Sequence, residues 1–415
     1  MSPRVCPWVL FVLPVLLCTS PSLEAPNVAQ LTLKASESLA SGSRLMHAGY
    51  LKNEGLEMVR FGGYSPDNGR TWSNVPIAPN FDQDLPQGYR REGFPLFVDH
   101  TNGRIIRLVP SMDTEGLDPT IVEPPIALQT YYLRYRVSLD QGKTWLFDEV
   151  VVQHGHAPMN PFEGIIRGRN GIFMGDVGSQ MIRTQAGKII IPAQACLLGE
   201  DGKLANPGGG WTYTDVVMVI GTWQADGHLT WEISRIEGDP ARTTRGVIEP
   251  TLAELDDGRL LCVMRGSNGG SKDPECKLPG YRWWCVSEDG GYHWTKPEPW
   301  TDEDGQPFHS PSSMSQLLKH SSGRIFWIGN LCAENPRGNN PRHPLVIGQV
   351  DPQSLRLIRG TVLVVDDKKP EEPGVNLSHF WGLEDRETGD IVIAGARHSL
   401  DYKEAHPHLW RVGVQ

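Results

Sequence analysis

One eight-residue pattern occurs three times in this 415-residue chain, at widely separated places. The copies read SPDNGRTW at 65–72, SLDQGKTW at 138–145 and SEDGGYHW at 287–294, so the shared core is Ser-x-Asp-x-Gly-x-x-Trp. The Asp carboxylate can accept hydrogen bonds from backbone N–H groups of its own turn, and the Gly permits a positive φ. The Trp buries a large ring and fixes the turn to the neighbouring sheet. A structural turn repeated in this way predicts a repeat architecture.

A second pattern, a β-hairpin, alternates with the first. Each copy has an apolar strand, a polar turn with a Gly, and a second strand rich in Ile, Leu and Val, which is typical of buried hairpins. Five clear copies span 94–109, 181–194, 249–265, 315–330 and 380–396, and a weaker one begins at Arg44. The glycines of these hairpin turns are therefore Gly55, Gly103, Gly187, Gly258, Gly323 and Gly389.

The order of the two patterns predicts the fold. A Ser-x-Asp turn follows the first, second and fourth hairpins, and the degraded copy QADGHLTW (224–231) follows the third, keeping Asp226 and Trp231. After the fifth hairpin, VDPQSLRL stands where a turn is expected. Six such units predict an all-β, six-bladed β-propeller, closed by the N-terminal strand around AQLTLKA beside the last blade. A β-sandwich with chance similarity among its turns is the alternative.

The first 25 residues predict a secretory signal peptide. Arg4 supplies a positive start, residues 8–17 form an apolar run, and small or polar residues follow as far as Ala25. The apolar run is far short of the roughly 20 residues that a membrane span needs. Leu17, directly before Cys18, is too bulky for a lipoprotein signal. We therefore expect an exported protein, secreted or periplasmic, without a membrane span and with residues 26–415 as one propeller domain.

Composition limits the partners. A formal net charge of −10 argues against nucleic acid, although a local arginine cluster can still bind a small anionic ligand. Five cysteines follow the signal peptide, and an odd number leaves at least one unpaired: Cys196, Cys262, Cys276, Cys285 and Cys332. Of these, Cys276 and Cys285 are near enough in sequence to bridge a loop. The sequence shows no cofactor motif, no metal-ligand spacing such as Cys-x-x-Cys and no signal for an oligomeric state.

Alternating strand direction predicts which loops share a face of the propeller. The hairpin turns join strands one and two of each blade, and the Ser-x-Asp turns join strands three and four, so both lie on one face. The opposite face carries three other sets of positions in each blade: the start of the first strand, the end of the second strand and the loop from the second strand to the third. These positions lie near the axis. The charged and aromatic residues at those places are Arg90, Arg91, Asp113, Tyr213, Glu249, Arg265, Tyr281, Arg337, Arg342 and His379. We expect this face to bind an anionic ligand.

With its Ser-x-Asp-x-Gly-x-x-Trp turns placed one to a blade, the mature chain resembles the sialidase superfamily, whose members carry such turns as Asp boxes. In sialidases a Glu opens the fourth hairpin and an Arg ends it, which matches Glu249 and Arg265 in EPTLAELDDGRLLCVMR. The resemblance implies an exported exo-glycosidase that hydrolyses a terminal acidic sugar. It also implies three arginines that hold the sugar carboxylate through paired hydrogen bonds. These would be Arg91, Arg265 and Arg342, with Arg90 and Arg44 as alternatives to the first and Arg337 to the last.

The resemblance further implies an acid/base residue and a nucleophile. Asp113 stands at about the expected place for the acid/base, with Glu115 and Asp118 as rivals, and a carboxylic acid near apolar walls can protonate a leaving oxygen. Sialidases use a Tyr nucleophile that the blade-four Glu activates. That Tyr opens the last hairpin, where this chain reads NLSHFWGLEDRETG, with His379 but no Tyr. The alternatives for this role are Tyr213, Tyr281 and His379.

Three hypotheses follow, all with an anionic glycan or oligosaccharide as partner. The first is hydrolysis of a sialic-acid-like linkage, which the missing Tyr weighs against. The second is a glycosidase or lyase for uronic-acid-containing polysaccharide, with Glu249 and either His379 or a Tyr as its reactive groups. The third is a carbohydrate-binding propeller without turnover. Retention of Glu249 weighs against the third, because an unpaired buried carboxylate beside a ligand costs free energy unless it has a task.

Overall fold

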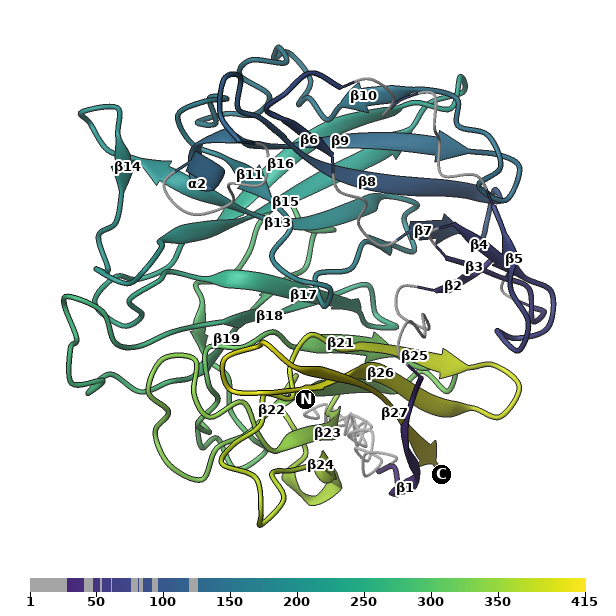
Figure 1. Ribbon diagram of the computed structural model, residues 1–415, viewed down its shortest axis with the longest axis vertical. Helices are drawn as coiled ribbons and strands as arrows, with labels where there is room; N and C mark the ends of the chain where they lie inside the picture. The colour runs from purple at the N-terminus through teal and green to yellow at the C-terminus, as the bar shows by residue number, and fades with distance from the viewer. Residues whose placement is uncertain are drawn as a thin grey trace, which may run out of the picture.

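The computed structural model describes residues 28–40, 48–52, 54–60, 62–75, 81, 85–91, 96–118 and 126–415. Its strands form six antiparallel sheets that follow one another along the chain, the blades of a β-propeller (Figure 1). The prediction of an all-β, six-bladed propeller is therefore confirmed. The predicted signal peptide and Arg44 lie outside the described residues. Among the helices of the described ranges, none is long and apolar enough to cross a bilayer.

The first three blades carry the sequence from residue 49 to residue 236. Blade 1 consists of β2 (Gly49–Tyr50), β3 (Met58–Arg60), β4 (Gly63–Ser65) and β5 (Ser73–Asn74). Blade 2 consists of β7 (Leu96–Asp99), β8 (Arg104–Asp113), β9 (Tyr131–Ser138) and β10 (Asp148–Val150), with β6 (Tyr89–Arg91) paired to the end of β8 and α2 (Ile126–Thr130) before β9. Blade 3 consists of β12 (Ile182–Arg183), β13 (Ile189–Leu198), β15 (Thr214–Trp223) and β16 (Leu229–Ile236), with β11 (Ile172–Phe173) and β14 (Leu204–Ala205) paired to β13.

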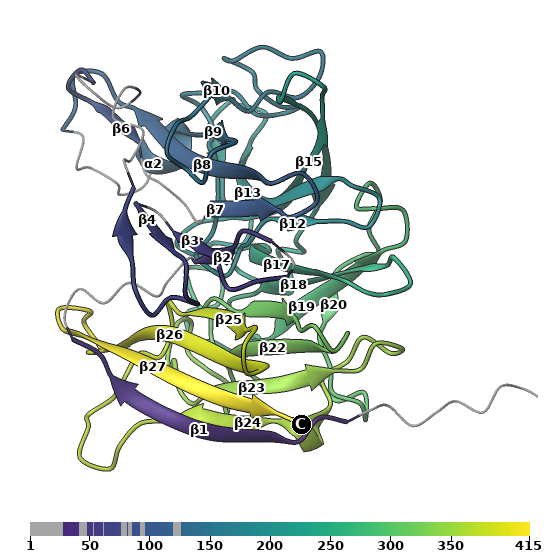
Figure 2. The same ribbon diagram turned by 90° about the vertical axis from the view of Figure 1, so that its right-hand side faces the viewer.

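The last three blades close the ring. Blade 4 consists of β17 (Ile248–Glu254), β18 (Leu260–Arg265), β19 (Arg282–Ser287) and β20 (Glu298–Pro299). Blade 5 consists of β21 (Gln316–Lys319), β22 (Ile325–Asn330), β23 (Leu345–Val350) and β24 (Leu363–Asp366), with the 3₁₀ turn η1 (Arg359–Thr361) before β24. Blade 6 consists of β25 (Trp381–Asp385), β26 (Asp390–His398), β27 (Ala405–Val414) and β1 (Leu31–Ser38), which runs antiparallel to β27 (Figure 2). The predicted closure by the N-terminal strand is thus confirmed, and it covers the edge of β27.

The Ser-x-Asp turns join the third and fourth strands of blades 1, 2 and 4, as predicted. In the first turn the Thr71 N–H donates to Asp67 Oδ1 at 2.8 Å, and Gly69 has a φ of 77°. The carboxylates of Asp140 and Asp289 accept the equivalent backbone hydrogen bond at 2.8 and 2.9 Å. These turns are therefore structural, and they leave the opposite face of the propeller to its longer loops.

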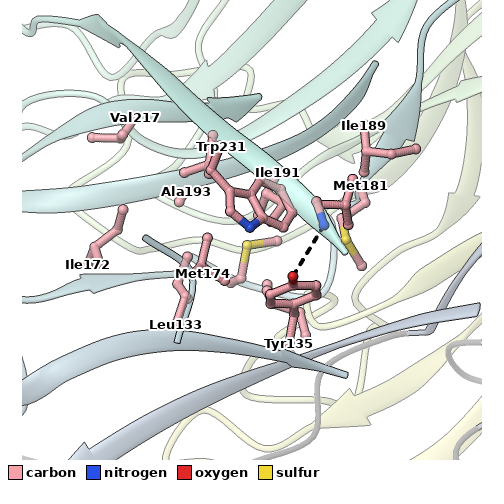
Figure 3. Packing of buried hydrophobic residues seen from close by; sticks show 14 of the residues in the cluster. Leu133, Tyr135, Ile172, Met174, Met181, Ile189, Ile191, Ala193, Val217 and Trp231 are labelled. Carbon is pink, nitrogen blue, oxygen red and sulfur yellow. Dashed lines mark hydrogen bonds between the residues drawn. The ribbon is translucent and has the colours of Figure 1, made fainter. Parts of the chain in front are cut away.

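Neighbouring blades pack through the apolar side chains of their longest strands. Between blades 2 and 3, the rings of Tyr135 and Trp231 meet edge to face with their centroids 5.2 Å apart (Figure 3). The Leu229 N–H donates to the Tyr135 hydroxyl at 3.3 Å, and burial raises the pKa of Tyr135 to about 12. Trp231 belongs to the degraded third turn, so its retention there has a packing reason.

A central cavity of about 520 Å³ marks the axis of the ring. Its lining includes residues of β2, β7, β12, β17, β21 and β25, which are the innermost strands of the six blades. Blades 6 and 1 also bond directly, since the Arg386 N–H donates to the Tyr50 hydroxyl at 3.1 Å. The first strands therefore surround one axis, which is the condition for their starting loops to converge.

The cysteines of the described residues are all unpaired. The suggested bridge between Cys276 and Cys285 is not formed, because Cys285 lies on β19 directly opposite Cys262 of β18. Cys262 and Cys285 are fully buried, and burial raises the pKa of the Cys262 thiol far above its usual value. Both side chains contribute to the packing of blade 4.

Candidate active site

The ends of the first two strands of blade 4 bring a carboxylate and a guanidinium together. Glu249 lies at the start of β17 and Arg265 at the end of β18, and Arg265 Nη1 donates to Glu249 Oε1. The same guanidinium donates from Nε to Ser312 Oγ at 2.7 Å and from Nη2 to Asn339 Oδ1 at 3.0 Å. Both side chains are largely buried, with exposed fractions of 12% for Glu249 and 7% for Arg265. The two residues share one face of the ring, as the topology predicts.

Blade 5 adds Arg342 to the same group. Its Nη2 donates to the Ser312 carbonyl at 3.2 Å, so Ser312 is shared with Arg265. Its Nη1 donates to Ser378 Oγ at 3.1 Å and to the Tyr402 hydroxyl at 2.5 Å. Arg342 therefore links loops of blades 5 and 6 to the Glu249–Arg265 pair.

Blade 6 supplies His379, whose Nδ1 lies 2.8 Å from Asp176 Oδ2. Asp176 belongs to the segment between β11 and β12 of blade 3, so this contact crosses the ring. A carboxylate that accepts the Nδ1 proton fixes the tautomer of the imidazole and leaves Nε2 for a ligand. Burial alone raises the pKa of Asp176, but the hydrogen bond and the charge of His379 bring it below its usual value. An imidazole oriented in this way is a common proton-transfer group.

The segment that carries Asp176 packs closely against three other blades at the site. A Cβ at Gly175 would lie 2.6 Å from Glu249 Cγ, and a Cβ at Gly178 would lie 2.3 Å from the Ser315 carbonyl oxygen. Only glycines permit so close an approach of two backbones. Residues 175–178 thus contact blades 4, 5 and 6 at once, and they hold Asp176 against His379.

Positive charge dominates this group of loops. The guanidinium groups of Arg245, Arg265 and Arg282 interact electrostatically with Glu249, and that of Arg342 interacts with all three; Asp176 interacts with Arg265. Burial lowers the pKa of Arg245 and of Arg282, the charges of Arg265 and Arg342 lower them further, and the charge of Glu249 raises them. A local excess of cations in a chain with a net charge of −10 indicates a site for an anion. We call these loops, with the four arginines, Glu249, Asp176, His379 and Tyr402, the cationic cup.

Two polar atoms of the cationic cup have no partner. Glu249 Oε2 and Arg282 Nη1 are buried, and no described residue forms a hydrogen bond with either. A buried polar group left unsatisfied costs about 1–3 kcal/mol. Such atoms are rare in folded proteins and require a reason. At Glu249 Oε2, a bound ligand would supply the missing hydrogen-bond partner.

Backbone strain also occurs at this site. Glu249, His379 and Tyr402 have φ values of 48°, 61° and 58°. A side chain other than Gly in this region costs on the order of 1–3 kcal/mol, and such residues gather at functional sites. Two of the three were candidates from the sequence. Tyr402, in the loop between β26 and β27, was not.

Comparison with known protein families shows the family to which the chain belongs. The model of the BNR repeat-like domain matches residues 90–368. The chain belongs to the BNR repeat-like family. Two of the three Ser-x-Asp-x-Gly-x-x-Trp turns of this BNR propeller, at 138–145 and 287–294, lie within the matched residues. Comparison with curated proteins gives no match.

Solved structures share the fold at low identity. A Dyadobacter fermentans protein of unknown function aligns with a TM-score of 0.55 and 13% identity, over 93% of this chain and 99% of that one. NanB sialidase of Streptococcus pneumoniae aligns with a TM-score of 0.51 and 13% identity, over 94% and 68%. The Trypanosoma rangeli sialidase, in complex with difluorosialic acid, aligns with a TM-score of 0.50 and 17% identity, over 84% and 48%. The BNR propeller thus spans about half the length of that sialidase.

The two tyrosines expected from the sequence have other contacts in the BNR propeller. The Tyr213 hydroxyl donates to the Gly238 carbonyl at 3.0 Å and lines a separate cavity of about 780 Å³, and burial raises its pKa. Tyr281 stacks on His309 with ring centroids 5.6 Å apart. In the described part of the chain, neither is hydrogen-bonded to Glu249. The cup instead contains Tyr402, whose ring meets that of His379 edge to face at 5.8 Å.

Arg91 and Asp113 pair with each other in a second charged group. Arg91 Nη1 lies 2.7 Å from Asp113 Oδ1, and Arg167 Nη2 lies 2.6 Å from Asp113 Oδ2. The Tyr132 hydroxyl also donates to Asp113 Oδ2, at 2.8 Å. Both oxygens of Asp113 therefore have hydrogen-bond or ion-pair partners within this group. No hydrogen bond or ion pair found among the described residues joins this group to Glu249.

Asp215, beside Tyr213, provides a pH-dependent test of the fold. Burial raises its pKa to about 6, although the Gly238 N–H donates to its Oδ1 at 3.0 Å. The folded state therefore binds this proton more tightly than the unfolded state, so stability falls as the pH rises from about 4 to about 6. Asp215→Asn keeps an acceptor without the charge. We expect it to raise the free energy of unfolding at pH 7.5 by about 2 kcal/mol.

Urea denaturation at pH 7.5 and pH 4 measures this effect. The expected gain is present at pH 7.5 and nearly absent at pH 4, where the wild-type carboxyl is protonated in the folded state and about half protonated in the unfolded state. Asp304→Asn, at an exposed position, is the control and should change stability by less than about 0.5 kcal/mol. An equal gain at both pH values would mean that burial of the Asp215 charge is not the cause.

Proposed function

We propose that this BNR propeller cleaves a glycosidic linkage beside a carboxylated sugar. The observation that carries the proposal is the cationic cup, in which Arg265 donates to Glu249 and Arg342 shares Ser312 with Arg265. A guanidinium binds a carboxylate through two parallel hydrogen bonds, which an ammonium group cannot do. Arg265 and Arg342 are the proposed carboxylate ligands, since they share Ser312 and extend from adjacent blades. The first candidate reaction is hydrolysis of a terminal sialic-acid-like sugar.

The proposed chemistry divides between two groups. His379, oriented by Asp176, gives its Nε2 proton to the leaving oxygen, and we assign it this role because both oxygens of Asp113 are occupied. Glu249 has Oε1 held by Arg265 and Oε2 without a partner. Its free oxygen either stabilises positive charge on the sugar ring or accepts a proton from the water that bonds to the anomeric carbon as the glycosidic bond breaks. The buried arginines keep the substrate carboxylate in place throughout.

One observation favours a second candidate, action on a uronic-acid linkage. The position where sialidases carry their Tyr holds His379, and this His is paired with Asp176. A lyase removes the proton next to the carboxylate carbon, forms a C=C bond and expels the glycosidic oxygen. Arginines that neutralise the carboxylate make that proton easier to remove. A neutral His379 with a free Nε2 is a suitable base for this step.

A substrate panel tests the proposed function. The full chain is incubated with a fluorogenic sialoside, a fluorogenic glucuronide and a uronic-acid oligosaccharide. Released fluorophore reports hydrolysis, and ultraviolet absorbance of an unsaturated sugar reports elimination. Turnover of the sialoside supports the first candidate, and turnover of the uronides alone supports the second. Binding of every acidic sugar without product would overturn the proposed reaction and leave a binding protein.

Arg342 and Arg337 offer a matched pair of arginines in one loop. Arg342 is buried in the cationic cup, whereas Arg337 is exposed and donates only weakly, at 3.4 Å, to the Glu275 carbonyl. We expect Arg342→Ala to weaken binding of an acidic sugar by about 10- to 100-fold, the worth of one charge-assisted pair. Arg337→Ala should change it by less than about twofold. Calorimetric titration measures both, and equal losses would contradict the assignment of Arg342.

A further inference from the structure

An exposed tryptophan stands next to the cationic cup. Trp211 is 69% exposed, while Trp231, Trp300 and Trp327 are almost completely buried. It lies in the loop between β14 and β15, after the run Pro-Gly-Gly-Gly. Trp combines a large apolar face with a polar N–H and is enriched at surfaces that bind ligands and partners.

Backbone contacts on both sides hold the loop that presents Trp211. The Gly210 N–H donates to the Thr244 carbonyl at 2.9 Å, and the Ser271 N–H donates to the Gly209 carbonyl at 2.8 Å. A Cβ at Gly208 would lie 2.4 Å from the Thr244 carbonyl oxygen, so glycine is required for this packing. The ring is thus held in place without being buried, and a ligand that meets it does not have to order the loop.

Arg245 connects Trp211 to the cup. Its Cζ lies 5.9 Å from the centroid of the Trp211 ring, and its Nη2 donates to Thr212 Oγ1 at 2.7 Å. Arg245 lies in the segment between β16 and β17, four residues before Glu249 of the cup. No ion pair within the described ranges includes Arg245. A partly exposed guanidinium without a carboxylate partner, adjacent to an open aromatic face, suits an anionic ring.

We propose that Trp211 and Arg245 form a second sugar subsite beside the cationic cup. The indole stacks against the apolar C–H face of a pyranose ring, and Arg245 binds the carboxylate of that sugar. The inference rests on the proposed function and adds the substrate class: a chain of at least two consecutive acidic sugars. The first sugar occupies the cup at Arg265 and Arg342, and its acidic neighbour occupies the Trp211 subsite. Uronic-acid oligosaccharides have this chemistry.

Calorimetry on the full chain with the Glu249→Gln substitution tests the subsite without turnover. The probes are glucuronic acid and an oligomer of three uronic acids. We expect the oligomer to bind at least about tenfold more tightly than the monomer. Adding Trp211→Ala should remove that difference and leave the monomer affinity within about twofold. Met159→Ala, which truncates a side chain that is 60% exposed, is the control and should have no effect.

The outcomes separate the subsite from the proposed function. Equal affinity for monomer and oligomer overturns the subsite. The subsite is also overturned if the oligomer binds equally well after Trp211→Ala but no longer binds after Arg265→Met. In that case the cup still binds an acidic sugar. If neither acidic probe binds at all, the subsite and the uronic-acid candidate are both overturned, and the sialic-acid candidate is decided by the substrate panel. Loss of monomer binding in Trp211→Ala would place Trp211 in the first sugar site, which also overturns the proposal.

Discussion

Glu249→Gln is expected to lower kcat by about 1000-fold or more, while an acidic sugar still binds within a few-fold of its wild-type affinity. Gln has nearly the same shape and can accept the hydrogen bond from Arg265 Nη1, so the arginine keeps its position. It has no negative charge to stabilise the sugar ring and cannot accept a proton. The effect should therefore fall on kcat and leave binding almost unchanged, which is the signature of a group used in the transition state.

Single-turnover kinetics and calorimetry measure the two parts of this expectation. Glu254→Gln is the matched control, because Glu254 lies on the same strand, β17, at the end toward the hairpin turn. It accepts hydrogen bonds from Gln185 N at 2.8 and 3.0 Å, and its replacement should leave kcat within about threefold. A comparable loss in both variants would show that strand β17 is merely destabilised. Full activity of Glu249→Gln would remove Glu249 from the mechanism.

His379→Ala is expected to lower kcat by about 100- to 1000-fold and to remove one limb of the pH–rate profile. The reason is loss of the group that transfers a proton at Nε2. Asp176→Asn should lower kcat by about 10- to 100-fold, because the partner that orients the imidazole then lacks its charge. KM should change little in either variant. The pH profile of Asp176→Asn should shift, which a purely structural role of Asp176 would not produce.

His293 is the matched control for this pair. Its Nδ1 lies 2.6 Å from Asp289 Oδ2 in the Ser-x-Asp turn of blade 4, so the same pairing of groups occurs on the opposite face. The side chain is 90% exposed, and His293→Ala should leave both kcat and the pH profile unchanged. An unaltered pH profile in His379→Ala would show that another group transfers the proton.

The fold could be predicted because its turns are written into local sequence. Asp67 and Gly69 act within one turn, so no distant contact is needed to recognise it. The same holds for the pairing of Glu249 with Arg265, which lie at the two ends of one hairpin. Closure by β1 could also be predicted, since an uncovered edge of β27 would be left without it.

The remainder of the site depends on contacts across the ring. Asp176 precedes the first strand of blade 3, and Tyr402 lies in a loop to a third strand, so the rule that found Glu249 and His379 would also have included them. Neither stands in a motif, and topology alone gives many such positions. Topology also does not fix the direction of a side chain. Tyr213 is on an expected loop, but its hydroxyl donates to Gly238.

The burial of each arginine in the structure shows which of them belong to the cationic cup, and the sequence alone could not show this. Arg337 and Arg342 lie in one loop with similar neighbours, and only Arg342 is buried and donates to the Tyr402 hydroxyl. Arg91 was expected with the carboxylate ligands, but it pairs with Asp113, and Arg167 completes that group. The sequence gave no sign of this pairing. Arg91 and Asp113 come from separate strands of blade 2, and Arg167 comes from a loop of blade 3.

Titration of the unmodified chain with single sugars tests the cationic cup most directly. Sialic acid and glucuronic acid are each compared with a neutral analogue in which the carboxylate is an amide, and Arg265→Met is titrated in parallel. We expect at least one acid to bind, its amide to bind about 100-fold more weakly or not at all, and Arg265→Met to lose the difference. Equal affinity for acid and amide, or unchanged acid binding in Arg265→Met, would contradict a carboxylate site built on that guanidinium.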